Sequence, residues 1–214
     1  MTSATRPAHI VLVIGTATDV GKTWVGGQVL TELRAAGTSV AARKPAQSFD
    51  PADPHPTDAM VLAAATGETP DQVCPAHRNY EVPMAPPMAA AALGLEPPTM
   101  AELLAELTWP HPAPAVGWVE TVGGPRSPIG TDGDAVDLAA AIQPDTIVLV
   151  ADAGLGTVNA VLLSVAPFAE FRIVVILNRY DDTVDLHRRN LAWLQTRKGL
   201  EVVTNPEALS KRLA

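Results

Sequence analysis

The chain has 214 residues and a mass of 22.4 kDa, a size that fits one domain better than two. Hydrophobic residues make up 47% and charged residues 18% of it, which provides enough apolar material for a packed core and excludes a disordered chain. Fifteen Lys and Arg against 23 Asp and Glu give a formal net charge of −8, which argues against a nucleic-acid or anionic-membrane partner.

Cys74 is the one cysteine of the sequence, so an intrachain disulfide and a zinc site made of cysteines are both excluded. The apolar stretch near the N-terminus is too short for a signal peptide, and no run of about 18 apolar residues predicts a transmembrane helix. We therefore expect a cytoplasmic protein that forms a single ATP-binding domain over residues 1–214, with no membrane or nucleic-acid partner.

Short apolar runs alternate with helical patterns, which is typical of a parallel sheet covered by helices. The β-branched run at 9–14 predicts a first strand buried on both faces. A helix is predicted from Lys22 to Ala36, ended by Gly37. Its predicted core-facing stripe consists of Trp24, Val25, Val29 and Leu33.

The rest of the chain continues this alternation, interrupted by a proline-rich middle part. Further strands are predicted at 39–43, 116–120, 146–151 and 172–177. Further helices are predicted at 58–66 with Thr57 as its cap, and near 87–93, 99–107, 134–142, 157–166 and 185–197. The predicted fold is a three-layer α/β/α sandwich with a mainly parallel sheet, without an internal repeat or a domain boundary.

The strongest motif follows the first strand directly, where residues 15–23 read Gly-Thr-Ala-Thr-Asp-Val-Gly-Lys-Thr. A strand, a Gly-rich turn, Gly-Lys-Thr and a helix form the context of a P-loop, in which backbone N–H groups and the helix dipole bind phosphate. Lys22 would reach the β- and γ-phosphates, and the Thr23 hydroxyl would ligate Mg²⁺. Five residues, one more than usual, separate Gly15 from Gly21, and the alternative is a chance Gly-Lys-Thr at a helix start.

The same segment resembles the phosphate loop of dethiobiotin synthetases, and further similar segments follow in that family's order. They extend over roughly residues 10–180 and are 44–48 (KPAQS), 57–59 (TDA), 80–86 (YEVPMAP), Glu120 and 155–159 (LGTVN). The resemblance implies a P-loop NTPase fold and an ATP-dependent cyclo-ligase of biotin biosynthesis. One amine of 7,8-diaminononanoate takes up CO₂ or bicarbonate to give a carbamate, which attacks the γ-phosphate. The second amine then attacks the resulting carbamic–phosphoric anhydride and closes the cyclic urea of dethiobiotin.

Two carboxylates are candidate Mg²⁺ ligands beside Thr23, since Mg²⁺ prefers hard oxygen ligands and usually takes one or two carboxylates. Glu120 ends a strand, at the edge where open α/β sheets bind ligands, and Asp58 begins a helix. By spacing alone, Glu120 could equally be a solvated strand end and Asp58 an acid that favours the helix dipole. The resemblance implies that both hold the metal.

Lys44 follows the second strand and precedes a proline that fixes the exit of the loop. Taken alone, such a lysine is a solvated surface charge. The resemblance implies instead that Lys44 and Lys22 are catalytic and hold the carbamate and the γ-phosphate, and that Ser48 and Thr18 contact the diamine. The expected nucleotide-binding residues are Thr18, Asp19, Val20, Gly21, Lys22, Thr23, Glu120 and Asn178.

Two asparagines carry further expectations. Asn178 at a strand end resembles the family's base-reading asparagine, against the alternative of an ordinary turn residue, and the segment 205–207 could pass the base edge. For Asn159 the resemblance implies a homodimer in which this residue contacts the substrate of the opposite subunit. The alternative is that Thr157 caps the helix and Asn159 is a polar residue of its first turn.

Three positions on the substrate side depart from the family's pattern. Thr121 replaces a glycine and would be strained if its backbone needed a positive φ. Phe49 also replaces a glycine, and its side chain narrows the substrate side of the loop. Ala160 replaces a histidine. They leave open a catalytically weak nucleotide-binding paralogue. A P-loop ATPase switch of the partitioning or septum-site type is a further alternative, although residue 16 is Thr where such loops carry an early lysine.

Overall fold

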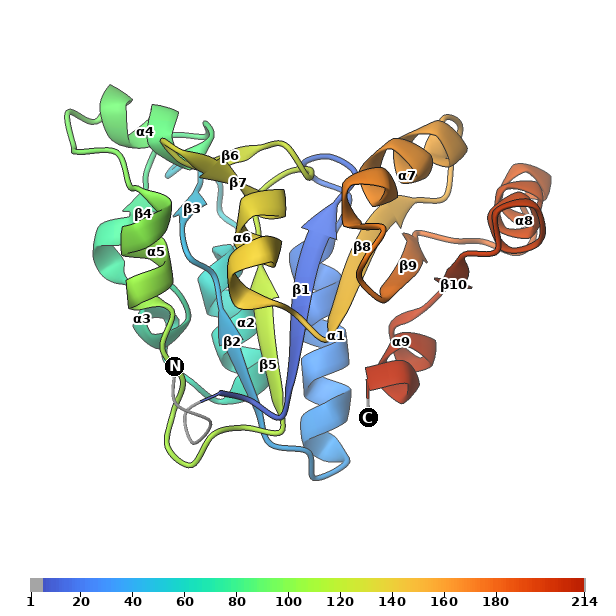
Figure 1. Ribbon diagram of the computed structural model, residues 1–214, viewed down its shortest axis with the longest axis horizontal. Helices are drawn as coiled ribbons and strands as arrows, with labels where there is room; N and C mark the ends of the chain where they lie inside the picture. Colours follow the sequence, from blue (N-terminus) through green and yellow to red (C-terminus); the bar gives the residue numbers. More distant parts are fainter. Residues whose placement is uncertain (1–5, 214) are drawn as a thin grey trace.

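The computed structural model describes residues 6–213, and at its centre lies a six-stranded sheet (Figure 1). Neighbouring strands pair in parallel in the order β10-β9-β8-β1-β5-β2. Because parallel strands share one carboxyl edge, the segments that follow them meet there. The strands of this sheet are β1 (His9–Gly15), β2 (Val40–Arg43), β5 (Val116–Glu120), β8 (Thr146–Asp152), β9 (Ile173–Asn178) and β10 (Glu201–Val203).

Helices cover both faces of this sheet, so the predicted three-layer α/β/α fold is confirmed (Figure 1). Successive residues of β1 pack on opposite sides, Leu12 into one core and Val13 into the other. The helices α1 (Lys22–Ala35), α2 (Asp58–Thr66), α3 (Pro70–Val73) and α9 (Pro206–Leu213) supply one core, and α4 (Pro86–Ala92), α5 (Met100–Glu106), α6 (Ala135–Ile142) and α7 (Thr157–Val165) supply the other.

Local signals set the limits of α2 as the sequence predicts. The Thr57 side chain accepts a hydrogen bond from the backbone N–H of Met60, which satisfies one of the free donors at the helix start. Gly67 ends the helix in the left-handed conformation with φ 81°, a conformation that glycine adopts without a steric cost. This start places Asp58 in the first turn, at the carboxyl edge of the sheet.

Several elements were not predicted, and most of them have two to four residues, which are too few to show a periodicity. The strand β10 and the helix α9 at the C-terminus are among them, and the predicted helix at 185–197 divides into α8 (Asp185–Ala192) and a π-helical turn at Trp193–Arg197. The remaining additions are the short helix α3, the strand pairs β3 (Gln47–Ser48) with β4 (Asn79–Tyr80) and β6 (Pro128–Gly130) with β7 (Gly133–Asp134), and the short turns Ala76–Arg78 and Ala166–Phe168.

The predicted core stripe of α1 is wrong at Trp24. Val25, Val29 and Leu33 are buried, but 53% of the surface of Trp24 is exposed. Gly26 approaches α2 instead, since a Cβ at this position would meet Leu62 and Trp118 at 3.0 Å. Residues 24 and 26 lie about 200° apart around the helix axis, so the contact of Gly26 with the core turns Trp24 to the outside.

Within residues 6–213, no helix is long and apolar enough to cross a membrane. The expectation of no leader peptide also concerns residues 1–5, which lie outside the described residues. Cys74 is buried in the core beside α3, and burial raises the pKa of its thiol to about 12. We infer that Cys74 is a packing residue and not a reactive thiol.

Candidate active site

The phosphate loop connects β1 to α1 at the carboxyl edge of the sheet. The backbone N–H of Gly15 donates to Gly123 O at 3.1 Å, and a Cβ at Gly15 would meet Ala17 O at 2.5 Å, so the loop folds tightly back on itself. Asp19 (φ 56°) and Gly21 (φ 92°) are both left-handed. These two residues turn the chain into α1, and the additional loop residue is accommodated in this way.

Lys22 is a buried cation at the start of α1. Its Nζ donates to Ala17 O at 3.3 Å, and no carboxylate of the described residues lies within ion-pair distance of it. Burial, and next the positive charge of Lys44, hold the pKa of Lys22 below its ordinary value. A desolvated ammonium without an anionic partner has a strong tendency to bind an anion, which agrees with the predicted phosphate contact.

Lys44 is not the solvated surface lysine that its position alone suggested, since only 1% of its side chain is exposed. Its Nζ lies 2.6 Å from Asp58 Oδ2 and 2.8 Å from Glu120 Oε1. Burial by itself lowers the pKa of Lys44, but the two carboxylates outweigh it and raise this pKa above its ordinary value. Lys44 is therefore a permanent cation between two carboxylates.

Thr23, Asp58 and Glu120 lie together as the sequence predicts, and Glu120 is buried, so it is not a solvated strand end. Thr23 Oγ1 is 2.7 Å from both Asp58 Oδ1 and Glu120 Oε1. Burial acts to raise the pKa of Asp58, but Lys44, followed by the Thr23 hydroxyl, lowers it overall. Both carboxylates thus lie beside a hydroxyl at the start of the phosphate-loop helix.

These three residues fit Mg²⁺ by the chemistry of their donor atoms. They offer hard oxygen ligands, and the buried Glu120 Oε2 has no hydrogen-bond partner in the described part of the chain, so an acceptor is left for a cation. Residues 6–213 contain no group of three or more His, Cys, Asp and Glu side chains arranged for a metal. A site with two carboxylates and one hydroxyl suits an ion that takes its remaining ligands from phosphate and water.

A cleft of about 390 Å³ lies over these groups and brings most of the predicted residues together. Val20 and Glu120 are buried beneath it, and Asn159 lies elsewhere, exposed on α7. The sequence reasoning missed Trp24, Val122, Gly123 and Arg179, of which the last three follow strand ends at the same edge. The predicted residues that line the cleft are Thr18, Asp19, Gly21, Lys22, Thr23, Lys44, Ser48 and Asp58.

Asn178 and Arg179 attach the end of β9 to the phosphate loop. Asn178 is buried, and its Nδ2 donates to Val20 O at 2.9 Å, which excludes an ordinary exposed turn residue. Arg179 donates to Asp19 O at 2.8 Å and lies 3.2 Å from Asp152 Oδ2. Both side chains therefore hold the loop in place from β9. Their position directly after a strand at the carboxyl edge is the signal that could have identified Arg179.

The start of α7 differs from the alternative in which Thr157 caps this helix. Its N-cap residue is Gly156 with φ 92°, and the Thr157 hydroxyl donates back to Asp152 O, so Thr157 is not the capping side chain. Asn190 of α8 donates to Ala153 O and Gly154 O at 2.9 Å each. This turn is thus held from two sides, while Asn159 stays free on the exposed face of α7.

The departures from the family pattern at Thr121 and Phe49 leave the phosphate side of the site intact, and Ala160 lies on α7, outside the cleft residues. Thr121 does not have a positive φ, and its hydroxyl donates to Val13 O at 3.0 Å, so it is not strained. Gly123 is the residue that needs glycine, with φ 54° and a Ser127 Oγ where a Cβ would lie. Phe49 lines a neighbouring hollow and not the cleft, while the Ser48 hydroxyl donates to Met84 O at 2.6 Å.

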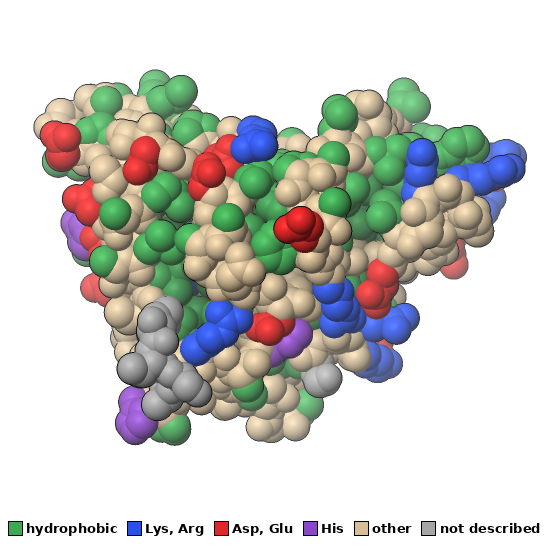
Figure 2. All heavy atoms as spheres, viewed as in Figure 1, with side chains coloured by type: hydrophobic (Ala, Val, Ile, Leu, Met, Phe, Trp, Pro, Cys, Tyr) green, Lys and Arg blue, Asp and Glu red, His purple; other side chains and the backbone are tan. Residues whose placement is uncertain are grey.

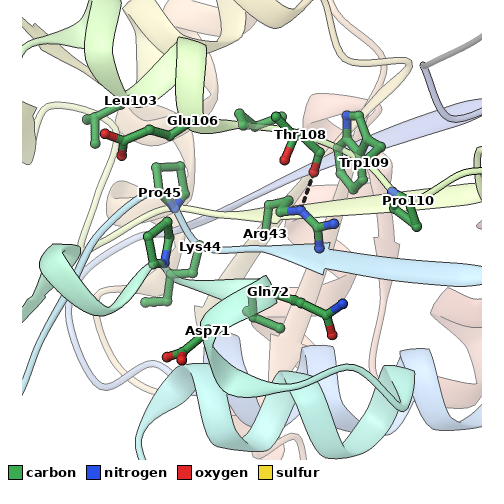
Figure 3. A pocket seen from close by; sticks show the side chains of 13 residues that line it. Arg43, Lys44, Pro45, Asp71, Gln72, Leu103, Glu106, Thr108, Trp109 and Pro110 are labelled. Carbon is green, nitrogen blue, oxygen red and sulfur yellow. Dashed lines mark hydrogen bonds between the residues drawn. The ribbon is translucent and has the colours of Figure 1, made fainter.

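A second hollow of about 260 Å³ lies between α3 and α5, on the far side of Lys44 and Pro45 (Figure 3). Two of its charged lining groups already have partners, since Arg43 pairs with Glu68 at 2.7 Å and Glu106 pairs with Arg78 at 2.7 Å. The Nζ of Lys44 takes part in the carboxylate cluster and is not free to act in this hollow. The candidate active site is therefore the cleft over the phosphate loop.

Comparison with known proteins shows to which family this chain belongs. Proteins named ATP-dependent dethiobiotin synthetase BioD are similar over almost the whole chain. The protein from Haloferax mediterranei is 33% identical over 94% of this chain and 85% of its own length. The chain belongs to the dethiobiotin synthetase family. Further family members, from Anaeromyxobacter dehalogenans and Rhodococcus jostii, are 35% and 34% identical over 94% and 96% of this chain and over 92% and 89% of their own lengths. A family model described as an AAA domain matches residues 9–209.

Solved structures confirm the P-loop fold of this dethiobiotin synthetase family member. The signal recognition particle receptor FtsY from Elizabethkingia anophelis superposes with a TM-score of 0.54 at 14% identity, over 98% of this chain and 66% of that one. The chloroplast FtsY of Physcomitrella patens gives a TM-score of 0.51 at 14% identity, over 100% of this chain and 67% of that one. At such identities the likeness concerns the fold alone.

Proposed function

We propose that this protein is an ATP-dependent dethiobiotin synthetase that closes the ureido ring of 7,8-diaminononanoate with CO₂, as the names of its relatives and the resemblance of its motifs indicate. The observation that carries the proposal is the convergence of two buried lysines, Lys22 and Lys44, over Thr23, Asp58 and Glu120. The proposal includes a single ATP-binding domain over residues 1–214 and a cytoplasmic location.

The proposed chemistry requires charge neutralisation and positioning, without a covalent nucleophile from the protein. The N–H groups at the start of α1 and Lys22 would bind the phosphates of ATP. Lys44, which lines the same cleft, would hold the carbamate oxygen close to the γ-phosphate. Its charge would stabilise the negative charge that develops as the anhydride forms. Thr18 and Ser48 line the same cleft and would orient the diamine by hydrogen bonds.

Thr23, Asp58 and Glu120 would hold the metal. Mg²⁺, when bound, supplies positive charge to the phosphate oxygens of ATP. Asn178 belongs to the proposed nucleotide site because its amide fixes Val20 of the phosphate loop, and Asp19 belongs to it through the Arg179 contact with its carbonyl. The proposed role of 205–207 at the base edge is weakened, because Asn205 Oδ1 accepts from Ala208 N at the start of α9.

The test of this function is the substrate dependence of phosphate release. We expect the purified protein to release phosphate from ATP at a high rate only when 7,8-diaminononanoate and bicarbonate are both present, and to form dethiobiotin in equal amount. Phosphate release that needs neither substrate would favour the ATPase switch. Binding of ATP without any dethiobiotin formation would favour the weak nucleotide-binding paralogue.

The metal site gives a second prediction. Glu120→Gln and Asp58→Asn keep the shape of the side chains but remove a charge, so each should raise the Mg²⁺ concentration for half-maximal rate at least about tenfold, the loss usual even for groups outside the ligand sphere. Mn²⁺ binding in the presence of ADP should weaken in parallel. Glu96→Gln, at an exposed position outside the cleft residues, is the matched control. Unchanged metal dependence in both variants would show that other groups hold the ion.

The proposed homodimer rests on the exposed face of α7. Leu163 of this helix is 68% exposed, and Asn159 lies four residues before it on the same helix face. Leu155, in the turn that precedes the helix, is 92% exposed. Hydrophobic side chains also gather at the upper right of the surface, over α7 (Figure 2). Large exposed apolar residues on a helix and in the turn before it favour contact with another protein surface. A second copy would bring Asn159 to the substrate of its partner.

If this arrangement holds, Asn159→Ala should raise the KM for the diamine about tenfold, the loss expected for one hydrogen bond to a charged group, with little change in ATP affinity. Mixing this variant with Lys22→Ala should restore low-KM activity after subunit exchange, because one site of the mixed dimer keeps both residues. Steady-state kinetics and light scattering measure the two effects. A monomer at assay concentration, or exchange without restoration, would refute the shared site.

A further inference from the structure

Trp24 stands out among the residues that line the cleft. It lies in the first turn of α1, directly after Lys22 and Thr23, and 53% of its surface is exposed. It belongs to neither of the two buried clusters of the described residues, so its indole adds nothing to the core. A large exposed aromatic ring at the rim of a ligand cleft favours a role in binding over a role in folding.

The orientation of the first turn separates Trp24 from the reacting end of the cleft. Thr23 Oγ1 faces Asp58 and Glu120 at 2.7 Å, and Lys44 lies behind the same two carboxylates. The next residue along a helix is turned by about 100°, so Trp24 points away from this group while it still lines the cleft. The cleft therefore has a charged side for phosphate chemistry and an aromatic rim.

We propose that the indole of Trp24 is the stacking platform for the nucleobase of the bound nucleotide. The inference rests on the nucleotide site proposed above and adds to it the group that receives the base. When the phosphates lie on the loop and the γ-phosphate faces Lys44, the nucleoside end leaves on the other side, where Trp24 forms the rim. Stacking on an aromatic ring uses the π-face that every base has.

This platform has a consequence for base selectivity. Asn178, the residue expected to read the base edge, uses its Nδ2 to hold Val20 O at 2.9 Å, which leaves its Oδ1 as the amide atom that can accept from a base. A site that binds the base mainly through its face discriminates weakly between bases of equal ring size, because stacking is tolerant of the base. Stacking on Trp24 therefore predicts that CDP, with its smaller ring, binds more weakly than ADP.

The deciding experiment compares Mg·ADP with Mg·pyrophosphate, two ligands that share the phosphates and differ in the base. Calorimetric titration of the full-length protein should show that Trp24→Ala weakens ADP binding about tenfold and leaves pyrophosphate binding unchanged. Trp24→Phe should retain most of the ADP affinity, since it keeps an aromatic face. Trp193→Ala is the matched control, because Trp193 is 48% exposed and lies in the turn after α8, outside the cleft residues.

Fluorescence provides an independent readout. ADP should quench the wild-type tryptophan emission, and this change should disappear in Trp24→Phe but persist in Trp193→Phe. Equal ADP affinity in wild type and Trp24→Ala, or equal losses for ADP and pyrophosphate, would overturn the role of Trp24 and leave the proposed function standing. A wild-type protein that binds neither ADP nor pyrophosphate would overturn the nucleotide site itself.

Discussion

Replacement of Lys44 by methionine is expected to lower dethiobiotin formation by about 10²- to 10³-fold and to destabilise the protein at the same time. The catalytic loss follows from the removal of a charge placed to act on developing negative charge, which typically costs about 10²- to 10³-fold for a single donor. The ammonium lies 2.6 Å from Asp58 and 2.8 Å from Glu120, so its loss leaves two carboxylates facing each other without a counter-charge.

Breaking a buried ion pair in this way costs about 3–5 kcal/mol, and we expect the lower end because the Asp58 side chain is 42% exposed and water screens its charge. For a protein of this size, about 3 kcal/mol lowers the melting temperature by roughly 6–12 °C. Scanning calorimetry without ligand measures this shift. Addition of Asp58→Asn to the variant should recover part of it, since one of the two facing charges is removed. A Lys44→Met protein with wild-type stability would contradict the ion-pair geometry.

The same substitution at Lys22 should also abolish turnover, but with the opposite effect on stability. Burial and the charge of Lys44 keep the pKa of Lys22 below its ordinary value, which means that the folded protein disfavours this ammonium relative to the unfolded chain. Methionine keeps the aliphatic stem and removes the disfavoured charge. We therefore expect Lys22→Met to be as stable as the wild type or more stable in the absence of nucleotide.

In the presence of ADP, we expect Lys22→Met to be less stable than the wild type. Lys22 lies on the phosphate loop, so its loss should weaken ADP binding more than the loss of Lys44 does, and the stabilisation by ADP in calorimetry should largely vanish. Lys211→Met serves as the control because Lys211 is an exposed lysine paired with Glu207 on α9, and such changes cost less than about 0.5 kcal/mol. A Lys22→Met protein with normal ADP affinity would exclude Lys22 from phosphate binding.

Nucleotide binding and the layered fold could be predicted from the sequence because the signals that specify them are local. The strand–loop–helix order around residues 9–36 identifies the phosphate loop, and Thr57 and Gly67 set the two ends of α2. Apolar runs of five to seven residues gave the positions of β1, β5 and β8, because a strand buried on both faces is apolar throughout. The three-residue β10 carries no such signal, and its pairing with β9 defines it.

The electrostatics of the site were decided by the tertiary structure alone. Lys44 and Glu120 are separated by 76 positions, and each reads by itself as a solvated charge; they are buried because β2 and β5 pair and α1 and α2 close over their ends. Trp24 shows the reverse case, an aromatic residue at a helical core spacing that Gly26 turns outward by its contact with Trp118. Spacing along the chain gives the period of a helix, but which face is buried depends on the neighbours that pack against it. The sequence by itself therefore determined the phosphate loop and the layers, and the packing of α1 against α2 and the sheet decided which charges are desolvated and which ring is left exposed.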